Sequence, residues 1–336
     1  MSDPSKYTVG LISALQVERL AAECMLDEEH ERLSFQAKGD LNDYTLGMIG
    51  QHNVVIASLP EGRYGTRNGA AVARDMARTF TDLRFAIMVG IGGGVPTRKN
   101  DIRLGDVVVA APSGPNYEII NFTCGKLIQG QEFQCIDSQT NTPQLLANAV
   151  AGLNSFHSRK GHDLQRIIRE SLALNPKARR RFRKPNVEED ILYVSDYRHE
   201  KEGQPCSKSC DRKLDSLYVV HRNSVDVEDP EDSRDDPTIH CGPIGSTDAL
   251  MKSATERDIQ AQAKSILCFE TESASLLQHF PCLPIRGISD YADTHKNDGW
   301  YDYAAITAAA YAKALLLWVL PSQVEAEKRT LGLLES

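Results

Sequence analysis

Short apolar segments alternate with amphipathic segments near both ends of this chain, and this alternation limits its fold more than any other feature. Strand-like segments such as YTVGLISAL (7–15) and LPIRGISD (283–290) end at small or polar residues, and segments with helical periodicity follow them. The pattern covers 7–112 and returns over 239–320. It is typical of an α/β domain. We expect one domain over 1–325, with a tail or linker after it over 326–336.

The middle of the chain breaks this alternation. Between roughly 150 and 238, two helical segments are followed by a basic run, KARRRFRK (177–184), and an acidic run, DVEDPEDSRDD (226–236). Charge blocks of this kind are usually solvated loops. We therefore expect 150–238 to be a long insertion in the domain, and the basic run to lie on its surface.

The overall composition is that of an ordinary soluble protein, with 41% hydrophobic and 25% charged residues. A formal net charge of −8 gives no global electrostatic attraction for nucleic acid. No apolar run approaches the roughly 18 residues of a membrane-spanning helix. The N-terminal residues lack a signal-peptide pattern. We expect a cytoplasmic protein that binds neither nucleic acid nor membrane.

Eight cysteines are scattered along the chain, and in the cytosol they should be reduced. Cys206 and Cys210, in CSKSC, suggest a pair of metal ligands. Further candidate zinc ligands in the sequence are His199, His221, His240 and Cys241. The CxxxC spacing is loose and the partners are ambiguous. Zinc therefore stays an open alternative, and the sequence assigns no metal or cofactor to the protein.

Acidic residues follow several strand-like segments, at positions where open α/β sheets bind ligands. Glu18 follows the first strand, Glu272 follows SILCF, and Asp290 follows LPIRGI. Each alone is more often a helix N-cap or first-turn anion. If the strands are neighbours, the three carboxylates surround one cleft. The glycine turn GIGGG (90–94) would then let a ligand approach the backbone.

The glycine-rich segments do not match the common nucleotide-binding fingerprints. GIGGGV lacks the spacing of GxGxxG, and EGRYGTRNG (61–69) is not GxxxxGK[ST]. Both mismatches argue against Rossmann and P-loop chemistry.

Five segments occur in the order found in the nucleoside phosphorylase/uridine phosphorylase superfamily: GLISALQVE, MVGIGGG…LGDVVVA, GSTDALM, CFETESAS and RGISDYAD. The chain resembles most closely the methylthioadenosine/S-adenosylhomocysteine nucleosidase branch, in the form of the fungal domains that stand at the head of ankyrin or NB-ARC proteins. The resemblance implies a three-layer α/β/α fold with a mixed central sheet. It also implies a homodimer, further domains C-terminal to this one, and a purine nucleoside or nucleotide as ligand.

The resemblance implies a role for each matching residue. Glu18 would handle the water nucleophile, Glu272 would bind the ribose hydroxyls, and Asp290 would protonate the purine. Leu250 and Met251 would wall the base. The other expected substrate-binding residues are Ile91, Gly92, Glu270, Thr271, Arg286 and Ser289.

These roles fit the chemistry of an N-glycosidic bond, which breaks through an oxocarbenium-like state. Asp290 can donate a proton to purine N7 only if burial or neighbouring carboxylates favour its protonated form. Glu18 would orient or deprotonate water, an effect commonly worth about 10²–10⁴-fold in rate.

The chain departs from the family pattern at three of these positions. Thr271 stands where the family has a methionine, which removes an apolar wall under the sugar and adds a hydroxyl. Ile91 stands where a serine or threonine is common. Leu250 replaces an aromatic residue that would stack on the base.

The choice between hydrolysis and phosphorolysis depends on the residues that would meet phosphate. Phosphorylases of the superfamily carry a Gly-Asp-Pro type loop with an arginine after the first strand, and this chain has SALQVER with Glu18 there. A carboxylate suits water and repels phosphate, so we expect a hydrolase. Anion-binding candidates in EGRYGTRNG are Arg63, Gly65, Thr66 and Arg67. They leave open a phosphorylase, or ATP as substrate, and a non-catalytic purine sensor is a third alternative.

Overall fold

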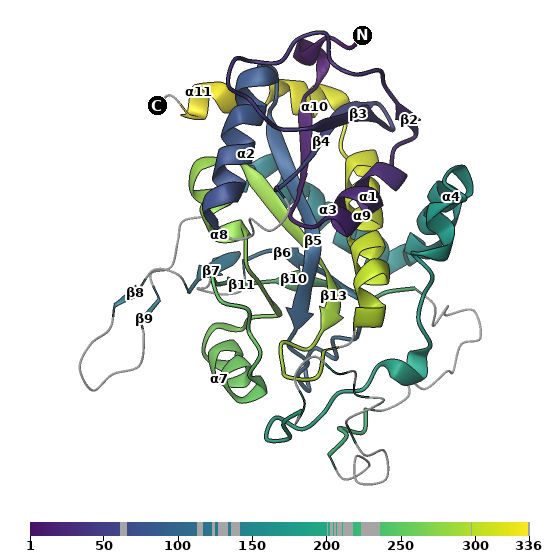
Figure 1. The fold of residues 1–336 in the computed structure, drawn as a ribbon, viewed down its shortest axis with the longest axis vertical. Helices are drawn as coiled ribbons and strands as arrows, with labels where there is room; N and C mark the ends of the chain where they lie inside the picture. Colours follow the sequence, from purple (N-terminus) through teal and green to yellow (C-terminus); the bar gives the residue numbers. More distant parts are fainter. Residues whose placement is uncertain are drawn as a thin grey trace.

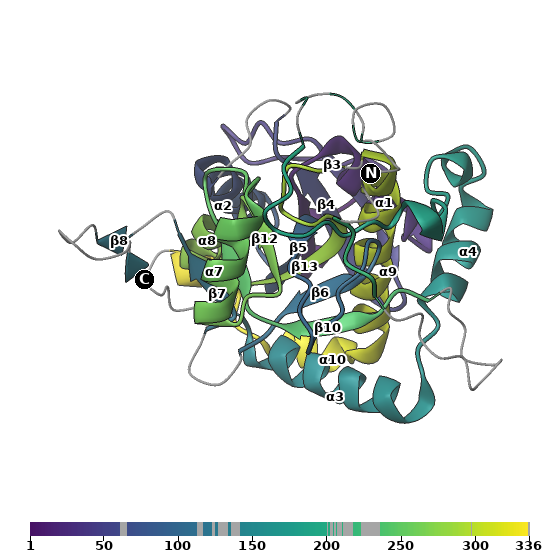
Figure 2. The same cartoon turned by 90° about the horizontal axis from the view of Figure 1, so that it is seen from below.

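The computed structural model describes residues 1–60, 66–112, 117–122, 125–126, 134–135, 142–199, 201, 204, 206, 210, 218–222, 236–296 and 298–334. A twisted sheet forms the middle layer, with α1 and α9 on one face and α2 and α8 on the other (Figures 1 and 2). The predicted three-layer α/β/α fold with a mixed sheet is confirmed.

The central sheet joins eleven strands of the described residues. In chain order they are β1 (Val9–Ser13), β2 (Glu28–Glu29), β3 (Tyr44–Ile49), β4 (His52–Ser58), β5 (Phe85–Gly94), β6 (Val107–Ala110), β7 (Ile119–Asn121), β10 (Ile239–Gly242), β11 (Ile244–Ser246), β12 (Cys268–Glu270) and β13 (Cys282–Asp290). A separate hairpin pairs β8 (Gly125–Lys126) with β9 (Gln134–Cys135).

The strand order is β10-β6-β13-β5-β1-β4-β3-β2. The central strands β13, β5, β1 and β4 are parallel. β6 runs antiparallel to β13 but parallel to β10, and β3 runs antiparallel to both of its neighbours. β12 pairs with the last residues of β5 and leads outward to β11 and β7. The carboxyl ends of β1, β5 and β13 therefore lie at the same edge of the sheet, toward which the β5 and β13 arrows point downward in Figure 1.

The helices follow the expected amphipathic segments closely. They are α1 (Gln16–Cys24), α2 (Thr66–Thr79), α3 (Gln144–Lys160), α4 (Leu164–Leu174), α7 (Ala254–Lys264), α8 (Ser273–His279), α9 (Tyr301–Trp318), α10 (Pro321–Ala326) and α11 (Thr330–Leu334). Single 3₁₀ turns are η1 (Pro4–Lys6), η2 (Ala178–Arg180), η3 (Val187–Glu189) and η4 (Asp298–Trp300).

The alanine-rich helix α9 fixes the strand that carries Asp290. A Cβ atom on Gly287 of β13 would lie only 1.8 Å from the carbonyl oxygen of Ala304, so helix and strand approach as closely as a glycine allows. The small side chain of Ala304 on the helix also permits this approach. The carboxyl end of β13 is thereby anchored to the largest packed part of the molecule.

The first part of the expected insertion belongs to the core. Helices α3 and α4 pack against α9, and Leu153, Ile168 and Phe182 are buried there. Phe182 lies inside the basic run, whose Arg179 and Arg180 are exposed as expected. The apolar stripes of the two helices explain the difference, because they need a partner surface and α9 supplies it. Most of the acidic run, 226–235, lies outside the described residues.

In the part of the chain that the structure describes, no single helix is long and apolar enough to cross a membrane, although the bent pair Asp298–Trp318 and Pro321–Gly332 (85°) meets the requirement by length and composition only.

Candidate active site

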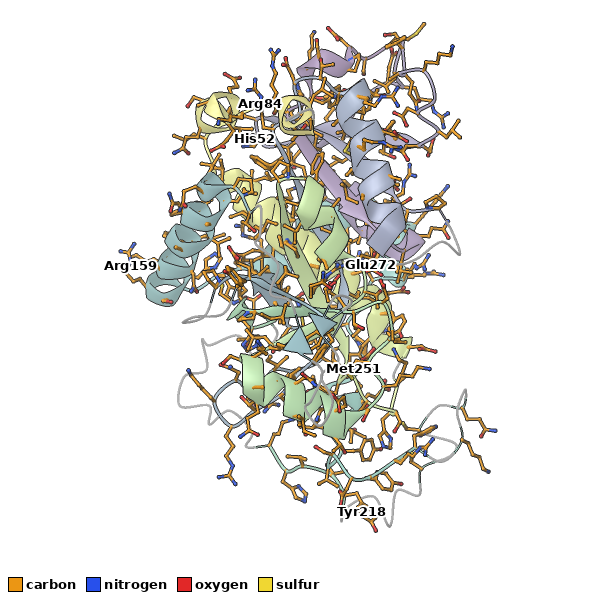
Figure 3. All side chains as sticks on the ribbon, turned by 90° about the vertical axis from the view of Figure 1, so that its left-hand side faces the viewer. His52, Arg84, Arg159, Tyr218, Met251 and Glu272 are labelled. Atoms are coloured by element: carbon orange, nitrogen blue, oxygen red, sulfur yellow. The ribbon has the colours of Figure 1, made fainter. Side chains whose placement is uncertain are left out.

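A cavity of about 390 Å³ opens where the carboxyl ends of β1, β5 and β13 meet the end of β12. Figure 3 shows Glu272 well inside the molecule and Met251 nearer the lower end. Ten of the expected site residues line the cavity: Glu18, Ile91, Gly92, Leu250, Met251, Glu270, Thr271, Glu272, Ser289 and Asp290. Residues far apart in the sequence are thus brought together because their strands are neighbours. Their chemical roles stay predictions.

Glu18 both caps a helix and faces the cavity. Its Oε2 accepts hydrogen bonds from the backbone N–H groups of Ala14 and Leu15, each at 2.8 Å, at the start of α1. Its Oε1 accepts from the N–H of Ile91 on β5 at 2.8 Å. Burial raises the pKa of Glu18, and Arg286 and these three N–H groups oppose the rise. A carboxylate has about four acceptor positions, so one remains for a water molecule.

Arg286 lies beneath the cavity, fully buried, and holds its carboxylates together. Its Nη2 pairs with Glu270, lies 3.5 Å from Glu272 Oε2, and donates to Ser273 Oγ at 3.0 Å. Burial disfavours the charge of this guanidinium, but the surrounding glutamates raise its pKa and keep it charged. Its Nε and Nη1 are buried without a hydrogen-bond partner among the described residues. These two nitrogens are therefore available to a bound water or ligand.

The GIGGG segment has a different purpose from the one expected. It is not a turn, because β5 runs through it to Gly94. A Cβ on Gly90 would lie 1.9 Å from Arg286 Nη1 and 3.0 Å from Glu18 Oε1. A Cβ on Gly93 would lie 2.8 Å from Asp290 Oδ1. The glycines thus make room for the protein's own site residues, although Gly92 and Gly93 also line the cavity.

Glu272 is a cavity carboxylate whose pKa lies well above its ordinary value. Burial raises the pKa of Glu272 to about 7, the charges of Glu270 and Glu18 add to the rise, and Arg286 opposes it. The Thr271 hydroxyl donates a hydrogen bond to Glu272 Oε1 and favours its charged form. Thr271 therefore orients the carboxylate beside it.

The carboxylate of Glu270 contacts other groups of the protein. Its carboxylate accepts from the N–H groups of Glu272 and Ser273, both at 3.0 Å, and pairs with Arg286. These contacts cap the start of α8 and neutralise part of the arginine charge. Glu270 lines the cavity, but these contacts fit a residue that holds its neighbours in place better than one that binds substrate.

Asp290 sits beside a cation that the sequence reasoning missed. Its Oδ2 accepts from Lys296 Nζ at 3.1 Å and from Ser289 Oγ at 3.4 Å, and its Oδ1 accepts from the N–H of Ala292 at 2.8 Å. Burial alone would lower the pKa of Lys296, but Asp290 and Tyr301 raise it above its ordinary value. Lys296 and Tyr301 both line the cavity. Lys296 could have been proposed from its position in the sequence, because it follows Asp290 by one short loop.

The apolar end of the cavity is made by Ile91, Met251 and Phe269. Phe269, on β12, is 3% exposed and was interpreted only as part of an apolar strand; it supplies the aromatic ring that Leu250 does not. Leu250 is 56% exposed at the rim. Helix α7, which follows this segment, begins only at Ala254, with Ser253 as its N-cap. Leu250 and Met251 therefore lie on a loop over the cavity.

The candidate anion-binding residues are not placed. Arg63 and Gly65 lie outside the described residues. Thr66 and Arg67 open α2, and their side chains are not described. Anion binding by this segment stays a prediction.

No family model matches the chain. A curated nucleotide-binding leucine-rich repeat (NLR)-like protein of Hyaloscypha variabilis is 40% identical over 322 residues, which is 96% of this chain. The chain spans 30% of the length of that relative.

Solved nucleosidases share the architecture. Futalosine hydrolase of Helicobacter pylori is 14% identical with a TM-score of 0.52, covering 93% of this chain and 97% of its own. The 5′-methylthioadenosine/S-adenosylhomocysteine nucleosidase of Neisseria meningitidis, in complex with methylthio-immucillin-A, is 15% identical with a TM-score of 0.53 (92% and 98% covered). The S. pneumoniae nucleosidase with a transition-state inhibitor is 18% identical with a TM-score of 0.54 (92% and 98% covered). This chain therefore has the α/β fold of the nucleosidases.

Proposed function

We propose that this protein hydrolyses the N-glycosidic bond of purine nucleosides of the adenine type. The observation that carries the proposal is the buried group of Glu18, Arg286 and Glu272 at one side of the cavity, with Asp290 on the same cavity. The nucleosidase fold supports the same reaction class.

The nucleophile is a water held between Glu18 and Arg286. Glu18 has one acceptor position left, and Arg286 Nη1 has no hydrogen-bond partner among the described residues. A Cβ atom on Gly90 would lie 1.9 Å from Arg286 Nη1 and 3.0 Å from Glu18 Oε1, so these two groups lie close together. The water donates to Glu18, accepts from Arg286 and attacks C1′ of the ribose, while Glu18 takes its proton.

Glu272 stabilises the sugar as the bond breaks. In its charged form it accepts hydrogen bonds from the 2′- and 3′-hydroxyls and favours the positive charge that develops on the ribose. Its contact with Arg286 and the Thr271 hydroxyl hold the carboxylate in place. Since the pKa of Glu272 is about 7, its charge depends on pH in the neutral range.

Asp290 protonates the leaving base. The electron pair of the broken C1′–N9 bond passes to the purine, which receives the Asp290 proton at N7. Lys296 Nζ lies 3.1 Å from Asp290 Oδ2, so a cation faces the proposed acid in the ligand-free site.

The charge of the cavity favours a neutral substrate. Its described lining has one cation, Lys296, and Arg286 lies buried beneath the lining. The carboxylates of the lining still outnumber these two cations: Glu18, Asp248, Glu270, Glu272 and Asp290. Such a lining attracts an oxocarbenium ion and repels phosphate. It supports hydrolysis over phosphorolysis and a nucleoside over ATP. Residues 61–65, which include the candidate anion-binding residues Arg63 and Gly65, lie outside the described residues. ATP is therefore included among the test substrates.

The test is chromatography of adenosine, methylthioadenosine, inosine and ATP after incubation with the protein, with and without phosphate. We expect free base and free ribose product from the neutral nucleosides, at a rate independent of phosphate. Ribose 1-phosphate would identify a phosphorylase, and ATP as the sole substrate would overturn the neutral-substrate assignment. Absence of cleavage at high protein concentration would leave a purine-binding sensor.

The assembly that we propose around this domain follows the earlier expectations. It is a cytoplasmic homodimer joined to C-terminal domains in a longer chain, in keeping with the NLR-like relative, which extends well beyond the match. Light scattering of the purified protein tests the dimer, and a monomeric mass at micromolar concentration would contradict it.

A further inference from the structure

A second cluster of polar side chains lies outside the cavity, where the segment that follows α4 returns to the loop after β13. It consists of His199, Cys206, Cys210 and His295, whose ligand atoms all lie within 4.8 Å of one another. Figure 3 places Tyr218, which belongs to the same part of the chain, at the lower end of the molecule. Of the partners that the sequence suggested, His199 is present, whereas His221, His240 and Cys241 are not.

The spacing of these atoms is that of ligands around one metal ion. His199 Nδ1 lies 3.2 Å from Cys210 Sγ and 3.7 Å from Cys206 Sγ. His295 Nδ1 lies 3.7 Å from Cys206 Sγ and 3.8 Å from Cys210 Sγ. In a tetrahedral site with Zn–S bonds of about 2.3 Å and Zn–N bonds of about 2.1 Å, sulfur and nitrogen ligands are about 3.6 Å apart.

Both imidazole rings are oriented to present a lone pair to the cluster. His199 Nε2 lies 2.9 Å from the carbonyl oxygens of Lys201 and Gln204. His295 Nε2 lies 3.2 Å from the carbonyl oxygen of Tyr197. A carbonyl oxygen only accepts, so Nε2 must carry the proton and Nδ1 must be unprotonated in the neutral ring. Metal-binding histidines are commonly held by such contacts.

Hydrogen bonds alone do not account for this arrangement. Two thiols have two protons, and these can serve only two of the four sulfur–nitrogen contacts. In the other two contacts a nitrogen lone pair would face a sulfur lone pair. A metal ion in the middle satisfies all four groups at once.

We propose that His199, Cys206, Cys210 and His295 bind one zinc ion in a closed, structural Cys₂His₂ site. Two thiolates and two neutral imidazoles suit zinc by ligand type and leave it no open position for substrate. Binding releases the two thiol protons to solvent, and the resulting site is electrically neutral. The ion ties two segments together that are 85 residues apart between Cys210 and His295.

The surroundings of the cluster show what the zinc ion stabilises. The His295 ring stacks on Tyr193 with centroids 4.0 Å apart and on Tyr197 at 5.1 Å, and Tyr197 stacks on Tyr218 at 4.5 Å. The N–H of His199 donates to Thr294 Oγ1 at 2.9 Å. His295 directly precedes Lys296, the partner of Asp290. The metal therefore holds the loop that positions Lys296.

The first test is the metal content of protein purified under reducing conditions without chelators. We expect inductively coupled plasma mass spectrometry to find one zinc ion per chain. Cobalt(II) put in its place should give the strong visible bands of a tetrahedral ion and a thiolate charge-transfer band. The cobalt spectrum uses the unaltered chain, so it does not depend on any variant folding.

Variants identify the ligands. Cys206→Ser and His295→Asn should each lose most of the zinc. With cobalt(II), Cys206→Ser should weaken the thiolate charge-transfer band, and both variants should weaken the visible bands of the tetrahedral ion. The matched controls are Cys241→Ser and His221→Asn, which change the alternative candidates from the sequence and should keep one zinc per chain.

Three results would overturn the proposal. The first is unaltered protein that stays metal-free and does not compete for Zn²⁺ with an indicator chelator. The second is a Cys206–Cys210 disulfide in the freshly reduced and repurified chain. The third is full zinc retention in both ligand variants.

Discussion

The carboxylate cavity and the Cys/His cluster are two polar groups built in different ways. The acidic residues of the cavity sit on or just after neighbouring strands, so the sheet fixes their relative positions. The cluster residues lie outside the sheet, and stacked rings and backbone carbonyls orient the two histidines. The loop after β13 connects them, because it carries both His295 and Lys296. The comparison indicates chemistry in the first group and structural support in the second.

The largest expected effect is a loss of turnover, and it distinguishes the carboxylate cavity from the Cys/His cluster. Asp290→Asn should reduce turnover by about 10²–10⁴-fold, because the purine loses its acid. The fold and the metal content should not change, since Asn keeps the shape and can still accept from the N–H of Ala292. Steady-state kinetics and the melting temperature measure both. Turnover at the unaltered rate would show that Asp290 is not the acid.

The opposite pattern is expected when the metal cluster is damaged. Cys206→Ser should lower the melting temperature, because metal binding adds to the folding free energy. Turnover should change far less than in Asp290→Asn, since no cluster residue lines the cavity in the described part of the chain. A variant with normal stability and abolished turnover would reverse the comparison.

The packing of the cavity can be tested at Gly90. Gly90→Ala should destabilise the protein by about 1–3 kcal/mol and reduce activity, because its Cβ would collide with Arg286 Nη1 at 1.9 Å. Gly332→Ala is the matched control, since a Cβ there meets nothing within 4 Å and lies in α11. Chemical denaturation compares them. Equal stabilities would mean that Arg286 is not held against β5.

Ribose binding should depend on pH through Glu272. Below its pKa of about 7 the carboxyl is protonated and loses its charge, so affinity for adenosine should fall by up to about tenfold per pH unit as pH decreases. Affinity should level off above that pH. Calorimetry in the Asp290→Asn background measures binding without turnover. Glu272→Gln in the same background should show no such slope, and a slope of equal size would assign the titration to another group.

The smallest effect is expected at Thr271. Thr271→Val keeps the shape but removes the hydroxyl that donates to Glu272, so the pKa of Glu272 should rise. A hydrogen bond worth about 1 kcal/mol corresponds to somewhat less than one pH unit. The binding curve should therefore move to higher pH by that amount. A curve that stays in place would show that Thr271 does not orient Glu272.

The difference between the two groups also explains what the sequence could predict. Strand periodicity and the rule that ligands bind at strand ends predicted that Glu18, Glu272 and Asp290 would share one cavity if their strands were neighbours, and in the structure all three line one cavity. Neither rule applies to His295 and its partners Cys206 and Cys210, because these residues lie outside the sheet. Loops have no period from which a side chain's direction can be read.

The features of the cavity that the sequence did not predict were missed for physical reasons. Lys296 was not predicted because its contact with Asp290 depends on the path of the intervening loop. Phe269 looked like core, and its strand is both buried and part of the cavity wall. The GIGGG segment looked like a turn, whereas its glycines leave space for Arg286 and Asp290. Sequence patterns show which side chains are polar or small, but only the packing shows what each of them contacts.

The most direct test of the proposed chemistry is adenosine cleavage in water labelled with heavy oxygen, with no phosphate present. We predict that the released ribose carries the label at C1, and that Glu18→Gln and Asp290→Asn each slow its appearance by at least about 10²-fold. Labelled ribose formed equally fast by all three proteins, or no ribose unless phosphate is added, would contradict a water nucleophile activated by Glu18 and a base protonated by Asp290.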